Sequence, residues 1–130
     1  MITPIYASLL AGLFVFLSVR TLLFRRKLRI GIGTNDNEQM LRAMRVHSNF
    51  VEYAPLALLL ILMIELIGGS NLIIHFTSIA LLAGRALHAY GVSQTNENYS
   101  YRVAGMACTF TSICTSAVCL LYLSLLNSSI

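Results

Sequence analysis

Ionisable and amide side chains recur along one face of a predicted helix that begins near residue 38. Successive members lie four, three, four and three residues apart, and they are Glu38, Arg42, Arg45, Asn49 and Glu52. At 3.6 residues per turn these positions share one face of a helix. Guanidinium groups bind carboxylates through forked hydrogen bonds, a carboxylate binds an ammonium group, and an amide both donates and accepts. This polar stripe is therefore suited to a small ligand with charges of both signs.

Two further helices are expected to bring polar groups to the same level. Arg85 and His88 lie three residues apart in "GRALHAYG", and Arg102 opens the last helix beside Tyr99 and Tyr101. The arginines of this region are Arg20, Arg42, Arg45, Arg85 and Arg102, whereas the carboxylates are Glu38 and Glu52, with Glu97 in a loop. Structural pairing of Arg45 or Arg85 with Glu52 is the alternative for individual residues. For the whole set the cationic surplus predicts an anionic or zwitterionic ligand.

The elements that carry these residues are long apolar segments. The 130 residues are 57% hydrophobic and 11% charged, whereas a soluble domain carries about 25% charged residues. Segments 4–24, 41–67, 72–90 and 103–126 each approach the roughly 20 residues that span a bilayer core. The alternation typical of a membrane barrel is absent. The sequence therefore predicts an all-α integral membrane protein, an antiparallel up-and-down four-helix bundle with residues 1–130 in a single domain.

Charge distribution predicts the orientation in the membrane. The basic run "RRKLR" at 25–29 follows the first segment, whereas the loop at 68–71 carries no charge. Cytoplasmic loops are enriched in Lys and Arg, so the polar end of the bundle is expected in the cytoplasm and both termini outside. The net charge of +4 then reflects topology and attraction to anionic lipid. It gives no reason to expect a nucleic-acid partner.

Other polar residues are assigned structural roles. Asn35 or Asp36 is expected to cap the second helix, and Glu65 is expected at an interhelix contact. His47 is expected to pack, with proton transfer as the alternative. The cysteines lie six and five residues apart, which fits no metal motif, so no metal site is expected and buried, reduced thiols are predicted at Cys108, Cys114 and Cys119.

The segment "RVHSNFVEYAPL" at 45–56 resembles the signature of the MAPEG family, the membrane-associated proteins in eicosanoid and glutathione metabolism. The shared pattern is Arg, three residues, Asn, two residues, Glu-Tyr and then Pro. The resemblance covers nearly the whole chain, including the four spans, the basic run after the first of them, "GRALH" at 84–88 and the arginine that opens the last helix. The resemblance is strongest to the short bacterial members of the family.

The resemblance implies a homotrimer in the bacterial inner membrane that binds glutathione between neighbouring subunits near the cytoplasmic face. It implies a detoxifying glutathione transferase, with peroxidase activity in addition, which joins the glutathione thiolate to a lipophilic electrophile from the bilayer. By matching position, the glutathione-binding residues are Arg20, Arg45, Asn49, Glu52, Tyr53, Arg85 and His88. Arg102 matches the arginine placed near the thiol. Arg25 is the alternative to Arg20 as the arginine from the first helix.

Two departures from the family pattern affect these expectations. Ser48 stands where some relatives have an arginine, which removes one clamp for a carboxylate. Val103 stands where the prostaglandin-synthesising relatives have a serine, which argues against that isomerase chemistry. The small residues of the last helix either line a route for the electrophile or form a packing seam, and they are Gly105, Ala107 and Thr109.

Other functions remain as alternatives. One is a noncatalytic, lipid-binding relative, against which the joint retention of Arg45, Asn49, Glu52 and Arg102 argues. Another is a small four-helix exporter, which typically carries a carboxylate in its first helix, whereas residues 1–24 contain none. The sequence also leaves open the identity of the electrophile and whether another cellular thiol replaces glutathione.

Overall fold

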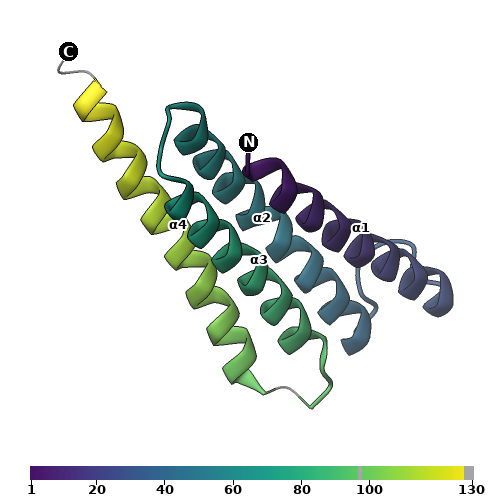
Figure 1. The fold of residues 1–130 in the computed structure, drawn as a ribbon. Coiled ribbons are helices and arrows are strands. Elements are labelled where there is room, and N and C mark those ends of the chain that lie inside the picture. The colour runs from purple at the N-terminus through teal and green to yellow at the C-terminus, as the bar shows by residue number, and fades with distance from the viewer. Residues whose placement is uncertain (97, 128–130) are drawn as a thin grey trace.

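The computed structural model describes residues 1–96 and 98–127, so Glu97 lies outside the described residues. Within those ranges there are four helices and no strand, namely α1 (Thr3–Leu28), α2 (Glu38–Leu66), α3 (Asn71–Ser93) and α4 (Tyr99–Asn127). Figure 1 shows them side by side and antiparallel. The start of α1 lies at the same end of the bundle as the end of α4, and the α1–α2 and α3–α4 loops lie at the other end. The predicted all-α four-helix bundle is confirmed.

The helices extend beyond the apolar segments at the end that carries the polar stripe. For example, α1 continues to Leu28 and α2 begins at Glu38. The cap of α2 is neither of the expected residues, because the side chain of Asn37 accepts a hydrogen bond from the Met40 N–H at 2.9 Å. Asn35 and Asp36 instead have φ angles of 47° and 56°. They form a left-handed turn that brings the chain to the cap.

The outer surface of the bundle is apolar, as a lipid environment requires. All four helices are long and apolar enough to cross a membrane. Large apolar side chains point outward along the bundle, including Phe16, Leu59 and Val118, which are 62%, 54% and 69% exposed. Cys114 is also exposed, so the prediction of buried thiols was wrong for this residue. The chain is an integral membrane protein.

Helix α2 lies in the centre of the arrangement beside α3 and, like α3, it contacts each of the other three helices. One side of it is buried at helical spacing, at Val46, Phe50, Ala54, Ala57, Ile61 and Ile64. Helix α1 packs on α2 and α3, and its described residues do not contact α4. The polar stripe of α2 therefore faces α3 and α4 without a contribution from α1.

Helices α3 and α4 make the most extensive contact, and glycines permit it. A Cβ atom on Gly84 would lie 2.7 Å from Thr109 Oγ1, and one on Gly105 would lie 2.5 Å from the backbone nitrogen of His88. Real side chains do not approach so closely, so both positions require glycine. Gly105 and Thr109 are buried here while Ala107 is exposed. Of the two roles expected for these small residues, Gly105 and Thr109 form a packing seam.

Glu65 fastens the opposite end of the bundle. Its carboxylate accepts hydrogen bonds from the backbone N–H groups of Ile2 and Thr3, the latter at 2.9 Å. A carboxylate at the start of a helix satisfies donors that have no partner within the helix. The expected interhelix contact of Glu65 is confirmed. His47 likewise packs between α1 and α2, with its Nε2 atom 3.0 Å from Ser18 Oγ.

Candidate functional site

A pocket of about 420 Å³ opens where α2, α3 and α4 meet. Its volume lies within the range of about 300–1,000 Å³ that is usual for small-molecule sites. The lining residues are Glu38, Leu41, Arg42, Arg45, Ser48, Asn49, Glu52, His88, Val92 and Arg102. All five residues of the polar stripe therefore face a single pocket, as their spacing predicts.

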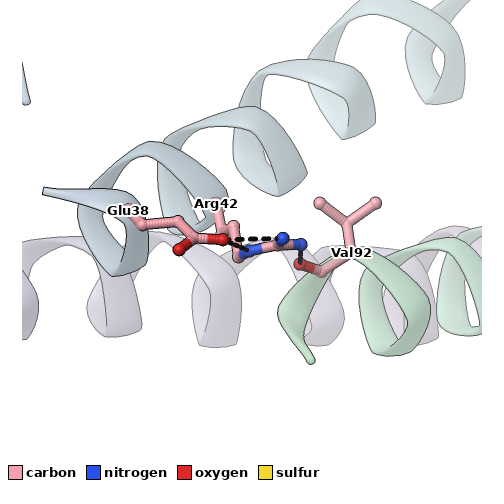
Figure 2. Close-up of polar contacts among 3 residues, drawn as sticks. All are labelled: Glu38, Arg42 and Val92. Carbon is pink, nitrogen blue, oxygen red and sulfur yellow. Dashed lines mark hydrogen bonds and ion pairs between the residues drawn. The ribbon is translucent and has the colours of Figure 1, made fainter. Parts of the chain in front are cut away.

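The first turn of α2 holds one arginine at the edge of this pocket. Arg42 donates from Nε and Nη2 to Glu38 Oε1 at 3.0 and 2.8 Å, and from Nη1 to the carbonyl oxygen of Val92 at 3.3 Å (Figure 2). The Glu38 side chain is 68% exposed, and an exposed pair at this spacing contributes only about 0.3–0.5 kcal/mol. The contact with Val92 ties α2 to the carbonyl end of α3, where a cation is favourable.

Arg45 and Glu52 line the pocket without ion-pair partners among the described residues. The ion pairs in that part of the chain are Glu38 with Arg42 and the amino terminus with Glu65. The pairing of Glu52 with Arg45 or Arg85, which was the structural alternative, is therefore not found. Charged groups within membrane spans are costly and normally face a cavity or a partner. These two side chains face the pocket, where a ligand or water can satisfy them.

Arg85 lies behind the pocket and not in its lining. Its side chain is buried, with 2% of the residue exposed. It donates to Asn49 Oδ1 at 2.7 Å from Nη1, and to Thr109 Oγ1 at 3.0 and 2.6 Å from Nε and Nη2. The Arg85 guanidinium carbon also lies 5.6 Å from the centre of the Tyr53 ring. Arg85 and Tyr53 thus support the α2 face of the pocket from within the bundle.

The structure separates Arg20 from the other predicted site residues. Arg45, Asn49, Glu52, His88 and Arg102 line the pocket. Arg20 instead donates to Ser93 Oγ at 2.5 Å and borders an apolar groove on α1 with Phe16, Val19, Leu23, Phe24 and Lys27.

Arg25, the alternative arginine from the first helix, shapes the α1–α2 loop. It donates to the carbonyl oxygens of Ile30, Gly31 and Gly33 at 3.5, 3.2 and 3.3 Å. Neither Arg20 nor Arg25 lines the pocket of its own chain.

Sequence reasoning placed Thr109 either on the route of the electrophile or in a packing seam and did not connect it with Arg85, to which this residue bonds directly. A signal was available, because Thr109 follows Arg102 by seven residues and so shares its helix face. Glu38 and Arg42 were placed on the stripe but not among the binding residues, and both line the pocket. Their part in the pocket depends on α3, which closes the pocket beside them and is distant in the sequence.

The fold and the pocket together define a class of four-helix integral membrane proteins with an arginine-rich pocket near one end of the bundle. The MAPEG family model matches residues 3–122. The chain belongs to the MAPEG family, whose members act in glutathione and eicosanoid metabolism and use glutathione.

Two curated bacterial proteins are similar in sequence to this chain. The chain is 33% identical over 113 residues to inner membrane protein YecN of Escherichia coli strain K12, a match that covers 87% of this chain and 85% of that protein. The YecN protein of Escherichia coli O6:H1 strain CFT073 matches with the same identity and coverage. No solved structure matches the chain. The four apolar helices and these relatives support an integral inner-membrane location.

Proposed function

We propose that this protein is a glutathione transferase, with peroxidase activity in addition, that works as a homotrimer on lipophilic electrophiles. The observation that carries the proposal is the convergence of Arg45, Asn49, Glu52 and Arg102 on one pocket. Membership of a family that uses glutathione supports the same choice of ligand. The Glu38–Arg42 pair closes one edge of that pocket.

Glutathione has two carboxylates, one ammonium group and one thiol, and the pocket offers a partner for each kind of charge. Arg45 and Glu52 are seven residues apart on α2, which corresponds to about 10 Å along the helix axis. An extended tripeptide spans a similar length, about 10 Å. In this proposal Arg45 binds a carboxylate of glutathione, Glu52 binds the ammonium group, and the amide of Asn49 binds between them.

Arg102 is the residue proposed to activate the thiol. The thiolate is the nucleophile, and a free thiol has a pKa near 8.5. Lowering that pKa by about two units requires about 2.7 kcal/mol of preferential stabilisation of the thiolate. A guanidinium group at the edge of an apolar bundle can supply this, because charges interact more strongly where water is scarce. The released proton leaves through the open side of the pocket.

The reaction then needs only an electrophile that is dissolved in the membrane. The thiolate sulfur supplies the electron pair for a new carbon–sulfur bond, and the leaving group departs with the pair from the bond it breaks. With a lipid hydroperoxide, two glutathione molecules are oxidised to the disulfide while the hydroperoxide is reduced to an alcohol and water. The exposed apolar side chains of α4, including Val103 and Phe110, support an approach of such substrates to the pocket from the membrane.

The position of Arg20 supports a site that is shared between subunits. No residue of α1 lines the pocket of its own chain, and α1 does not contact the described part of α4. In the proposed trimer, Arg20 reaches the pocket of a neighbouring chain. The basic run at the end of α1 supports a cytoplasmic position for this end of the bundle, where glutathione is available.

The first test is a glutathione titration of the purified protein that follows the ultraviolet absorbance of the thiolate. We expect a saturable thiolate signal that Arg102→Ala loses and that Arg26→Ala retains, since Arg26 is exposed at the end of α1 and does not line the pocket. Binding without a thiolate signal would favour the noncatalytic relative. Absence of binding would overturn the glutathione assignment.

A further inference from the structure

The buried guanidinium of Arg85 is surrounded by neutral groups. Its acceptors are Asn49 Oδ1, the Asn49 carbonyl oxygen, Thr109 Oγ1 and the sulfur of Met106. No carboxylate pairs with it among the described residues. A buried cation without a counterion is costly unless its hydrogen bonds are well satisfied. A role for Arg85 in fixing the direction of those hydrogen bonds would account for a buried cation at this position.

The hydrogen bond to Arg85 decides which end of the Asn49 amide faces the pocket. A guanidinium group has only donors, so the amide must turn its oxygen toward Arg85. The distance of 2.7 Å between Nη1 and Oδ1 is short, as expected for a charge-assisted bond. Asn49 also lines the pocket. Its NH₂ group is therefore the part left for a ligand, although an unconstrained asparagine would present either end.

Thr109 fixes Arg85 in turn. Its hydroxyl donates to the carbonyl oxygen of Gly105 at 2.9 Å, so its lone pairs are available to Arg85. They accept from Nε and Nη2 at 3.0 and 2.6 Å. The close approach of α3 and α4 at Gly84 and Gly105 makes this contact possible. The hydrogen bonds form a series from Gly105 through Thr109 and Arg85 to Asn49. The donor and the acceptor of each bond in this series are therefore determined.

We propose that Thr109 and Arg85 are positioning residues that hold Asn49 as a hydrogen-bond donor and so select a ligand acceptor, a carboxylate or peptide carbonyl, at this point of the pocket. The inference rests on the proposed function, because glutathione supplies that acceptor. It also revises the role of Arg85, which acts through Asn49 and does not touch the ligand. Neither Arg85 nor Thr109 belongs to the lining of the pocket.

The test is a double-mutant cycle on glutathione affinity in the purified full-length protein. Thr109→Val keeps the shape of the side chain and removes the acceptor, so we expect about tenfold weaker binding, the effect of one lost hydrogen bond to a ligand. Thr109→Ser keeps the hydroxyl and should bind as the wild type does. In an Asn49→Ala background, Thr109→Val should have no further effect on affinity, because its action passes through Asn49.

Ser112→Ala is the matched control for packing. Ser112 is buried one turn beyond Thr109 and donates to the carbonyl oxygen of Thr77 at 2.8 Å, so its loss also removes a hydrogen bond between α3 and α4. We expect a lower unfolding temperature with unchanged glutathione affinity. If Thr109→Val does not fold, Thr109→Ala removes the same acceptor with a smaller side chain and takes its place in the cycle.

The outcomes separate the two proposals. Wild-type protein that binds glutathione, with equal affinity in Thr109→Val, would overturn the positioning role and leave the proposed function intact. Additive losses in the cycle would show that Thr109 acts only through packing, which also overturns it. A wild-type protein that does not bind glutathione would overturn the proposed function and, with it, the selection of an acceptor from this ligand.

Discussion

Glu52 and Arg45 are two turns apart on α2 and line the same pocket, yet neither has an ion-pair partner in the described part of the chain. Their separation keeps them from neutralising each other across the pocket. A ligand that brings a cation to one end and an anion to the other gains both interactions at once. Under the proposed function, selectivity for a zwitterion would follow from the spacing of these two residues on a single helix.

This separation of charges can be tested with a change in the protein and a matching change in the ligand. We expect Glu52→Gln to weaken glutathione binding about tenfold or more, as the loss of a charged hydrogen-bond partner for the ammonium group. The same variant should bind N-acetylglutathione, which lacks the ammonium group, as well as the wild type does. The measurement is the dissociation constant of both ligands for both proteins.

The unfolding temperature of the variant is the control for this experiment. Glu52→Gln removes a charge from a membrane span, so the unfolding temperature in detergent should stay the same or rise. An equal loss of affinity for both ligands would show that Glu52 does not meet the ammonium group.

Among the helices, the packing seam between α3 and α4 holds residues of the pocket in position. Gly105 lies against the backbone of His88, and a Cβ atom there would be 2.5 Å from the His88 nitrogen and 2.8 Å from the Gly84 oxygen. Both are backbone atoms, which move only if the helices separate. Because His88 lines the pocket and Gly84 precedes Arg85, a wider seam displaces residues of the site as well.

We therefore expect Gly105→Ala to destabilise the protein by about 1–3 kcal/mol, the usual cost of overpacking, and to weaken glutathione binding. The measurement is thermal unfolding in detergent, together with the glutathione titration. Gly12→Ala is the control, because a Cβ atom on Gly12 meets no atom within 4 Å. Equal unfolding temperatures for the two variants would contradict the close approach of the helices.

Most of these elements could be predicted from the sequence because their signals are local. A run of apolar residues identifies a span, and the four-three spacing from Glu38 to Glu52 identifies the face that lines the pocket. The cap was misplaced because asparagine and aspartate suit both a cap and a left-handed turn. The roles of Thr109 and Arg20 depend on which helices pack together, and no local pattern encodes that.

At the scale of the whole molecule, α1 is the element that the pocket of its own chain does not use. Arg20 borders a groove on α1 whose other residues are apolar except for Lys27. Arg20 also bonds to Ser93 near the end of α3, so its guanidinium group is held at the level where the pocket opens. In the proposed trimer, a second copy packed against this face would receive Arg20 beside its own site.

The proposed sharing of a site between subunits predicts that two inactive variants complement each other. Chains with Arg20→Ala and chains with Arg45→Ala should each form homotrimers with strongly reduced glutathione transfer. If each site takes Arg20 from one chain and Arg45 from its neighbour, random mixing in equal amounts leaves about one site in four with both arginines. Co-expressed and co-purified chains should therefore recover about a quarter of the wild-type rate.

A site built within one chain would give a different result, because every chain in the mixture lacks one of the two arginines. Recovery in the mixture of Arg20→Ala and Arg45→Ala chains would then be absent. Mixing Arg45→Ala with Glu52→Ala provides the matched control, since both residues line the pocket from α2 of one chain and no arrangement of these chains restores a site. Recovery in the first mixture and none in the second would place Arg20 in the pocket of a neighbour and show that α1 completes a site between subunits.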